Sequence, residues 1–165
     1  MEGPLVISNT TPLINFAEIG CLDLLGELFG TVVIPPAVEI EVMAKSGLFA
    51  AAAEAIHDGL MPVLPPKDVL LVRSFLAAVH PGESECLALA LEHPGSLLLL
   101  DDLAAREIAG ANGCLYTGTI GCLAEAKKRG LISAIGPLLM ALRTRARFWI
   151  SEPLFQAVLR GAGEA

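Results

Sequence analysis

The feature that most constrains the fold is a run of four leucines at residues 97–100, which follows a turn-forming Pro-Gly-Ser and ends at Asp101 and Asp102. A short apolar run bounded by turn residues is typical of a strand buried on both faces of a parallel sheet. In open α/β sheets, the carboxyl ends of the strands form the ligand crevice. Two adjacent carboxylates at such an end repel each other, so they need a cation, a proton or a basic partner. This strand end is therefore the first candidate site.

Short apolar or β-branched segments alternate with helical segments along the chain. We expect strands at residues 5–7, 31–34, 61–64, 97–100 and 114–117. We expect helices at residues 12–19, 22–29, 36–45, 48–57, 67–79, 83–92, 104–111, 119–129, 135–145 and 152–160. Such alternation predicts a three-layer α/β/α fold with a central parallel sheet of about four to five strands. We expect a single domain over residues 1–165, on which the C-terminal helices of residues 135–161 pack.

The chain is apolar enough that a membrane protein has to be considered. Hydrophobic residues make up 54% of it, and its mean hydropathy is +0.64. The longest stretch without a charged residue, 108–124, contains one asparagine, two threonines and four glycines. A spanning helix needs about 20 mainly apolar residues. We therefore expect no membrane association and a cytoplasmic protein.

The four cysteines form no C-x-x-C pair and have no histidine at zinc spacing, so we expect them to be small buried residues. The net charge of −7 is unevenly distributed, because residues 127–165 carry 7 of the 11 basic residues. The basic residues of this segment form two clusters: Lys127, Lys128 and Arg129, and Arg143, Arg145 and Arg147. Such local positive charge can bind nucleic acid, or it can complement a helix C-terminus and form a solvated face.

Several short stretches, in order, resemble the motifs of one nuclease family. They are residues 6–14 (VISNTTPLI), 34–38 leading to Glu41, 82–90 (GESECLALA), 98–102 (LLLDD) and 118–121 (GTIG). Together they resemble the PIN domain family of metal-dependent nucleases that cut RNA, and within it a stand-alone prokaryotic branch of predicted nucleic-acid-binding proteins. The resemblance covers nearly the whole chain.

The resemblance implies a set of acidic residues that hold one or two Mg²⁺ or Mn²⁺ ions. The candidate metal ligands are Glu41, Glu85, Asp101 and Asp102, and the candidate catalytic residues are these four with Asn9. Hard cations take oxygen ligands and activate water for phosphodiester hydrolysis. The candidate nucleic-acid-binding residues are Thr10, Thr117, Thr119, Lys127, Lys128 and Arg129. The implied substrate is single-stranded RNA, the implied products carry a 5′-phosphate and a 3′-hydroxyl, and the implied role is that of a toxin with a small antitoxin protein as partner.

Asn9 departs from the family pattern, which normally has aspartate at this position. An amide oxygen can ligate a hard cation, but it brings no negative charge. Glu83 and Ser84 are nearby and can compensate in part for the missing charge. We therefore keep two interpretations, a weakened nuclease and a catalytically silent module that binds nucleic acid or protein. Abundant apolar residues also permit a homodimer.

Each acid also has an ordinary structural interpretation. Asp101 or Asp102 can cap the following helix, Glu83 and Glu85 suit a helix N-terminus, and Glu41 can lie on a solvated helix face. The hydroxyls of the Thr-Gly-Thr at 117–119 can be caps, or the turn can bind an anion such as an RNA phosphate. The sequence lacks a P-loop and a dinucleotide fingerprint, which disfavours nucleotide hydrolysis and dinucleotide binding. A phosphoacceptor receiver domain is disfavoured because its acid pair would follow the first strand, where Ser8 and Asn9 stand.

Overall fold

The sheet of the computed structural model has four strands in the order β2-β1-β3-β4, and every pairing is parallel. The structure describes residues 3–165, so residues 1 and 2 of the expected domain lie outside the described residues. The strands are β1 (Val6–Ser8), β2 (Val32–Val33), β3 (Leu97–Leu99) and β4 (Leu115–Thr117). Four of the five expected strands are thus confirmed, each within two residues at either end.

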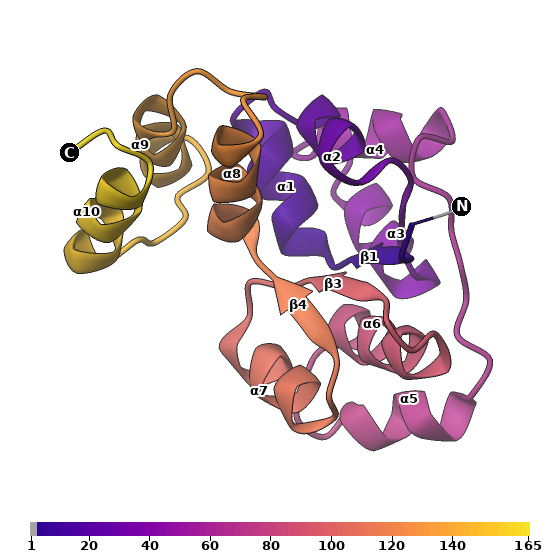
Figure 1. Cartoon of the computed structure of the whole chain (residues 1–165). Helices are drawn as coiled ribbons and strands as arrows, with labels where there is room; N and C mark the ends of the chain where they lie inside the picture. The colour runs from indigo at the N-terminus through magenta and orange to yellow at the C-terminus, as the bar shows by residue number, and fades with distance from the viewer. Residues whose placement is uncertain (1–2) are drawn as a thin grey trace.

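The described residues form ten helices. They are α1 (Thr10–Glu18), α2 (Asp23–Phe29), α3 (Pro36–Ala44), α4 (Ala50–His57), α5 (Val69–Phe75), α6 (Pro81–Glu92), α7 (Leu103–Ala111), α8 (Thr119–Lys128), α9 (Gly136–Thr144) and α10 (Glu152–Gly161). Figure 1 shows α1, α2, α4 and α8 on one face of the sheet and α6 and α7 on the other, with α5 packed on α6. The expected three-layer α/β/α fold is confirmed. No helix within residues 3–165 combines the length and the apolar composition needed to cross a bilayer.

Two predicted elements differ from the structure. The strand predicted at 61–64 is reduced to one parallel bridge between Ile34 and Val63, because Pro62 and Pro65 flank Val63 and proline cannot donate to a ladder. The helix predicted at 67–79 is shortened to α5, since the side chain of Asp68 accepts from Leu71 N (2.9 Å) and so sets its start. None of the residues of α5 is fully buried, and its Phe75 is half-buried against the core.

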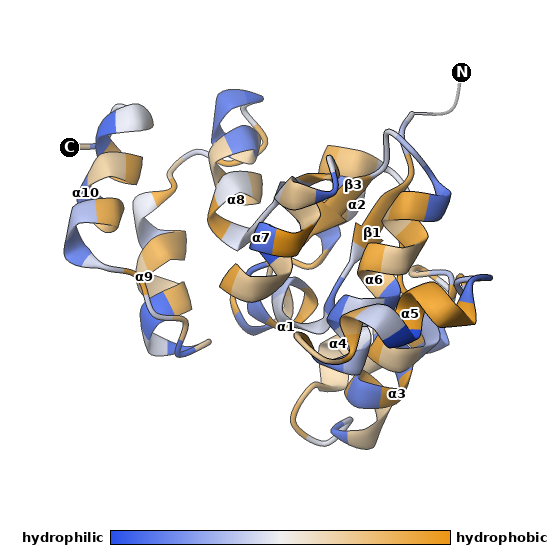
Figure 2. Cartoon of the chain, turned by 90° about the horizontal axis from the view of Figure 1, so that it is seen from below, coloured by the Kyte–Doolittle hydropathy of each residue, from blue (hydrophilic) through white to orange (hydrophobic). Residues whose placement is uncertain are grey.

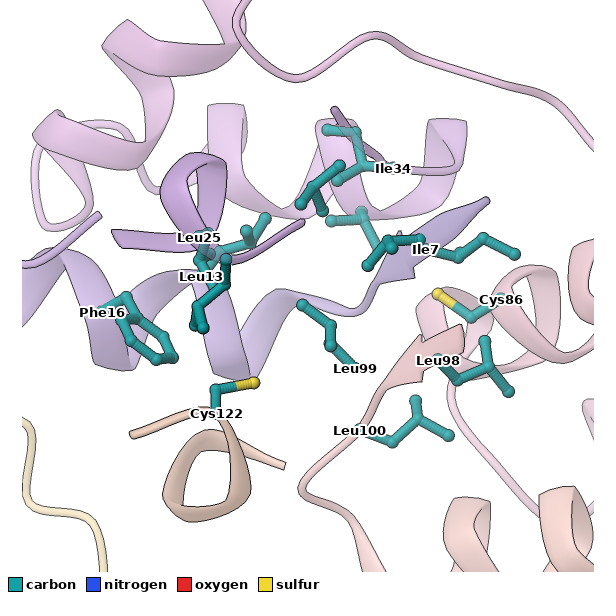
Figure 3. Packing of buried hydrophobic residues seen from close by; sticks show 14 of the residues in the cluster. Ile7, Leu13, Phe16, Leu25, Ile34, Cys86, Leu98, Leu99, Leu100 and Cys122 are labelled. Atoms are coloured by element: carbon teal, nitrogen blue, oxygen red, sulfur yellow. The ribbon is translucent and has the colours of Figure 1, made fainter. Parts of the chain in front are cut away.

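The core lies on both faces of the sheet, as the apolar strands predict. Figure 3 shows Leu99 directed towards Leu13 of α1, whereas Leu98 of the same strand lies near Cys86 of α6. This alternation is the two-residue period of a strand. Cys86 and Cys122 are buried and Cys21 and Cys114 are half-buried, and all four are free. The expectation of buried cysteines is therefore confirmed for two of them.

The C-terminal helices α9 and α10 lie beyond α8, on the side away from the sheet (Figures 1 and 2). Figure 2 shows hydrophobic and hydrophilic bands along α10, and its Phe155 is buried with Leu139 and Leu142 of α9. The carboxylate of Glu164 accepts from the backbone N–H groups of Ile135 (2.7 Å) and Gly136 (2.9 Å) at the start of α9. This contact ties the end of the chain to the N-terminus of α9.

We expect the contribution of Glu164 to stability to depend on pH. The two backbone N–H groups at the start of α9, helped by Lys127, hold the pKa of Glu164 below its ordinary value of 4.5. A lowered pKa stabilises the fold above pH 4.5, and this contribution is lost as the pH falls through the folded-state pKa. Glu164→Gln should therefore lower the melting temperature at pH 7, and the difference from wild type should shrink below pH 4. A difference that stays constant down to pH 3 would contradict this account.

Candidate active site

The carboxyl ends of β1, β3 and β4 meet at one edge, because the hydrogen-bonded ladder continues beyond the strands. Asn9 N donates to Leu99 O (3.1 Å), and Leu100 N donates to Thr117 O (2.9 Å). A pocket of about 380 Å³ opens there, and we call it the acidic pocket. It is lined by Asn9, Thr10, Thr11, Glu41, His80, Glu83, Asp101, Asp102 and Phe148. Chain segments that are far apart in sequence thus meet in one pocket.

Asn9 lies at the centre of this arrangement and has one unusual atom. Its side chain is buried, and its Nδ2 donates to Glu83 Oε1 at 2.8 Å. Its Oδ1 has no hydrogen-bond partner among the described residues. A Cβ on Gly82 would lie 2.8 Å from this oxygen, so only glycine leaves it room. A buried oxygen without a partner is costly, and such an atom calls for a ligand or a water to explain it.

Glu41 reaches the pocket from the second turn of α3. Its Oε2 accepts a hydrogen bond of 2.7 Å from Thr10 Oγ1, the first residue of α1. The same oxygen would lie 3.7 Å from a Cβ on Gly82, and Asn9 Oδ1 would lie 2.8 Å from that Cβ. Glu41 and Asn9 therefore approach one another across Gly82. Glu41 is exposed, as the solvated-face interpretation expects, and its carboxylate also lines the acidic pocket.

Asp101 is held more firmly than the other acids. Its Oδ1 accepts from Thr119 N (2.8 Å), and its Oδ2 accepts from Thr119 Oγ1 (2.6 Å) and from Asn15 Nδ2 (3.3 Å). Its side chain is only 5% exposed, and it forms an ion pair of 3.7 Å with Arg106. The anion site expected at the Thr-Gly-Thr turn is thus filled by a carboxylate of the chain itself.

Gly118 allows Arg106 to approach Asp101. A Cβ on Gly118 would lie 1.8 Å from Arg106 Nη2 and 2.6 Å from Asp101 Oδ1, so any larger residue collides with both. Arg106 Nε also donates to Leu100 O (2.7 Å), which fixes the guanidinium at the end of β3. The need for glycine here comes from space alone, because its backbone is extended.

Asp102 and Glu85 have structural hydrogen bonds. Asp102 caps α7, since its Oδ1 accepts from Ala105 N (2.8 Å), and it also lines the acidic pocket. Glu85 accepts from Ala37 N (2.8 Å) at the start of α3 and does not line the pocket. The structure therefore brings Asn9, Glu41, Asp101 and Asp102 together but leaves Glu85 outside. Glu83, two residues earlier on α6, takes that place.

The predicted nucleic-acid-binding residues divide into two groups. Thr10 and Thr119 hold acids of the pocket, whereas Thr117 is the last residue of β4 and does not line the acidic pocket. The basic cluster lies at the opposite end of α8 from Thr119. In this cluster Lys127 pairs with Glu164 (3.2 Å), Arg129 pairs with Glu125 (2.7 Å), and Lys128 is exposed. The structure does not bring this cluster to the acids. Its three residues lie at the C-terminal end of α8, and two of them form ion pairs within the chain.

Sequence reasoning did not single out Asn15 or Arg106, and it gave Glu83 only a compensating role. Asn15 is a buried amide between apolar neighbours on α1, and such a residue in an apolar helical segment is a detectable signal. Arg106 is one of only four basic residues before Lys127, and it follows Asp101 by five positions. Glu83 and Glu85 could not be told apart, because which face of α6 turns inward depends on packing.

The acidic pocket has an excess of negative charge. Among the ion pairs of residues 3–165, only that of Asp101 with Arg106 involves a pocket acid. Glu41, Glu83 and Asp102 are paired with neutral donors instead. The charge of Asp101 is felt in the core, because burial first and then this carboxylate raise the pKa of Cys122 to about 12.

The pocket oxygens fit a hydrated divalent cation. Mg²⁺ keeps several waters and uses one or two carboxylates, so a hard oxygen set is sufficient. The unpartnered Asn9 Oδ1 and the uncompensated carboxylates of Glu41 and Glu83 supply such a set. No three His, Cys, Asp or Glu side chains of the described residues converge closely enough to hold a metal by themselves. Asn9 would therefore have to contribute as an amide ligand, with water completing the shell.

Comparison with known proteins agrees with this geometry. A family model described as PIN domain matches residues 5–164. No curated protein and no solved structure matches the chain significantly. PIN domains have a nuclease-like fold and are typically nucleases, and the matched range contains every residue of the acidic pocket. The chain therefore belongs to the PIN domain family.

Proposed function

We propose that the protein is a Mg²⁺- or Mn²⁺-dependent ribonuclease that hydrolyses phosphodiester bonds of single-stranded RNA. The observation that carries the proposal is the buried Asn9 Oδ1, which has no partner among the described residues and lies beside Glu41 and Glu83. A bound divalent ion would lower the pKa of a water and offset the charge of the scissile phosphate. Asn9, Glu41, Glu83 and Asp101 would hold the ion, directly or through water.

The residues of the chain support this reaction in distinct ways. Thr119 and Asn15 fix the carboxylate of Asp101, and Thr10 fixes that of Glu41. No side chain caps α1, so the N–H groups of Thr10 and Thr11 are available to a phosphate at the pocket. In the reaction, the water oxygen bonds to phosphorus and the bond from phosphorus to the 3′-oxygen breaks. The products are a 5′-phosphate and a 3′-hydroxyl.

Cleavage of a labelled single-stranded RNA oligonucleotide tests the proposal. We expect cleavage with Mn²⁺, none with excess EDTA, and restored cleavage when Mn²⁺ is added back. The product ends should accept ligation, which needs a 5′-phosphate and a 3′-hydroxyl. Cleavage that persists in EDTA, or products with a 2′,3′-cyclic phosphate, would contradict the proposal, since they indicate a metal-free attack by the 2′-hydroxyl.

A silent binding module is the alternative that one observation favours. The oxygens of Asp101 already accept three hydrogen bonds and an ion pair, and Asn9 brings no charge. A protein that binds RNA equally well with and without Mn²⁺, and never cleaves it, would be this module. The same oligonucleotide assay separates the two functions, because it measures binding and cleavage on one substrate.

We also propose that a small protein partner controls the activity, as in a toxin and antitoxin pair. Exposed apolar side chains support a protein contact, since Val69 and Leu70 of α5 are 59% and 75% exposed. Expression of the chain alone should arrest bacterial growth, and expression of the Asp101→Asn variant should not. Normal growth with the active protein would remove the toxin role. A homodimer through the same apolar side chains would appear in light scattering as twice the chain mass.

A further inference from the structure

A second pocket adjoins the acidic pocket and has a different chemistry. It has a volume of about 400 Å³ and shares Asp101 and Phe148 with the acidic pocket. Its walls also include Arg106, Tyr116, Trp149 and Leu154, and we call it the aromatic pocket. Pockets of this size hold small organic ligands. Because two residues line both pockets, the two pockets are immediate neighbours.

Trp149 makes this pocket unusual, because it is 81% exposed. It is the only tryptophan of the chain. Its neighbours fix the backbone on both sides, since Phe148 N donates to Leu142 O (2.9 Å) and Ile150 O accepts from Arg143 Nη2 (3.0 Å). Ile150 itself is buried. An exposed indole is thus presented by an anchored segment, which lowers the conformational entropy that a ligand would have to remove.

A strained backbone conformation lies two residues before Trp149. Arg147 has φ of +53°, which is the left-handed region that residues other than glycine seldom adopt. Such a conformation costs about 1–3 kcal/mol and persists where the surrounding structure holds it. Here it turns the chain so that Phe148 and Trp149 follow at the pocket wall. The strained residue is also an exposed cation next to the aromatic pair.

Arg106 brings a cation to the wall of the aromatic pocket. Its guanidinium lies 5.8 Å from the centroid of the Tyr116 ring and 3.7 Å from Asp101 Oδ1, so it stands where the two pockets meet. Its side chain is 33% exposed, so it can contact a ligand. Aromatic faces beside a guanidinium recognise a nucleotide, because bases stack on the rings and the guanidinium binds phosphate.

We propose that the aromatic pocket binds an unpaired base of the RNA strand next to the bond that is cut. The base stacks on Trp149, and Arg106 binds the phosphate that joins this nucleotide to the acidic pocket. This inference rests on the proposed ribonuclease function and adds the site that makes the enzyme select single strands. A paired base is stacked within its duplex and is not available to Trp149.

The fluorescence of Trp149 tests this directly, because no other tryptophan contributes. An eight-nucleotide single-stranded RNA is titrated into the protein in EDTA, so that binding is measured without cleavage. The matched ligand is an oligomer of equal length whose nucleotides lack bases, so that the phosphate charge is unchanged. We expect the RNA to quench the tryptophan emission and to bind at least 5-fold more tightly than the abasic oligomer, as stacking of one base predicts.

Variants measured by anisotropy of a labelled RNA complete the test. Trp149→Ala should weaken binding by about 5- to 150-fold, and Trp149→Phe should restore most of it. Leu48→Ala, which removes an apolar side chain that is 74% exposed between α3 and α4, should have no effect. Equal binding of RNA and abasic oligomer, or unchanged emission, would overturn the proposal. So would a Trp149→Ala protein that binds RNA normally but changes its oligomeric state, since the pocket would then be a protein interface.

The two proposals fail in different ways. If Mn²⁺-dependent cleavage occurs but Trp149 does not respond to RNA, only the base-binding site is wrong. If RNA quenches Trp149 through its bases but no cleavage occurs with Mn²⁺, only the nuclease function is wrong.

Discussion

Asp101→Asn is expected to lower Mn²⁺-dependent RNA cleavage by at least ~100-fold. The carboxylate accepts from Thr119 N, Thr119 Oγ1 and Asn15 Nδ2, so both of its oxygens face donors. An amide offers one oxygen and turns an NH₂ group towards a donor. The variant therefore loses a negative charge at the pocket and at least one hydrogen bond, which lowers the free energy of unfolding by about 1–3 kcal/mol.

Circular dichroism and a thermal melt separate the two effects of Asp101→Asn. We expect a folded protein with a lower melting temperature and no measurable cleavage. Glu107→Gln is the matched control, because Glu107 is an exposed acid on α7 that lines neither pocket, and it should keep wild-type activity. A folded Asp101→Asn protein that cleaves RNA within a few-fold of wild type would contradict the assigned role.

Asn9→Asp is expected to make stability depend strongly on Mn²⁺. The hydrogen bond of 2.8 Å from Asn9 Nδ2 to Glu83 Oε1 would become a contact between two carboxylates. Without metal, the lost buried hydrogen bond and the new repulsion should lower the free energy of unfolding by about 1–3 kcal/mol or more. A divalent ion binds both carboxylates, so at 100 times its Kd it should return about 2.7 kcal/mol. Thermal melts in EDTA and in Mn²⁺ measure both.

The same variant should cleave RNA faster than wild type in Mn²⁺, because a full charge replaces an amide dipole at the metal. Asn112→Asp serves as the control, since Asn112 is exposed at the end of α7 and away from both pockets. Its melting temperature should respond to Mn²⁺ as that of wild type does. An Asn9→Asp protein that gains neither stability nor activity from Mn²⁺ would show that this position does not face a metal.

Much of the fold follows from local sequence. The leucine run and the β-branched residues at 31–34 predict strands because they suit burial on both faces of a sheet. The segment at 61–79 is less predictable from pattern alone. Its prolines prevent a strand from forming a ladder, and the cap at Asp68 starts a helix with no fully buried residue. The spacing of apolar residues does not predict how deeply the apolar face of such a helix is buried.

The candidate site is predictable where topology alone decides it. Asn9 and Asp101 meet because β1 and β3 are parallel and end at the same edge of the sheet. The sequence predicts both strands and their parallel arrangement. Glu83 and Glu85 lie two positions apart on α6 and so about 200° apart around the helix. Which of them faces Asn9 depends on how α6 packs against α3, and the local sequence does not contain that information. Lys127 and Arg129 form ion pairs with Glu164 and Glu125, and the sequence does not predict these pairings.

Mn²⁺ binding to wild type, Glu83→Gln and Glu85→Gln, measured by calorimetry, tests the central claim most directly. Both substitutions remove one charge from α6, but only Glu83 contacts Asn9 and lines the acidic pocket, whereas Glu85 is bonded to Ala37 N. We predict that wild type and Glu85→Gln bind Mn²⁺ with similar affinity and that Glu83→Gln binds at least ~10-fold more weakly. Equal binding by Glu83→Gln and wild type, or no binding by wild type, would contradict the account.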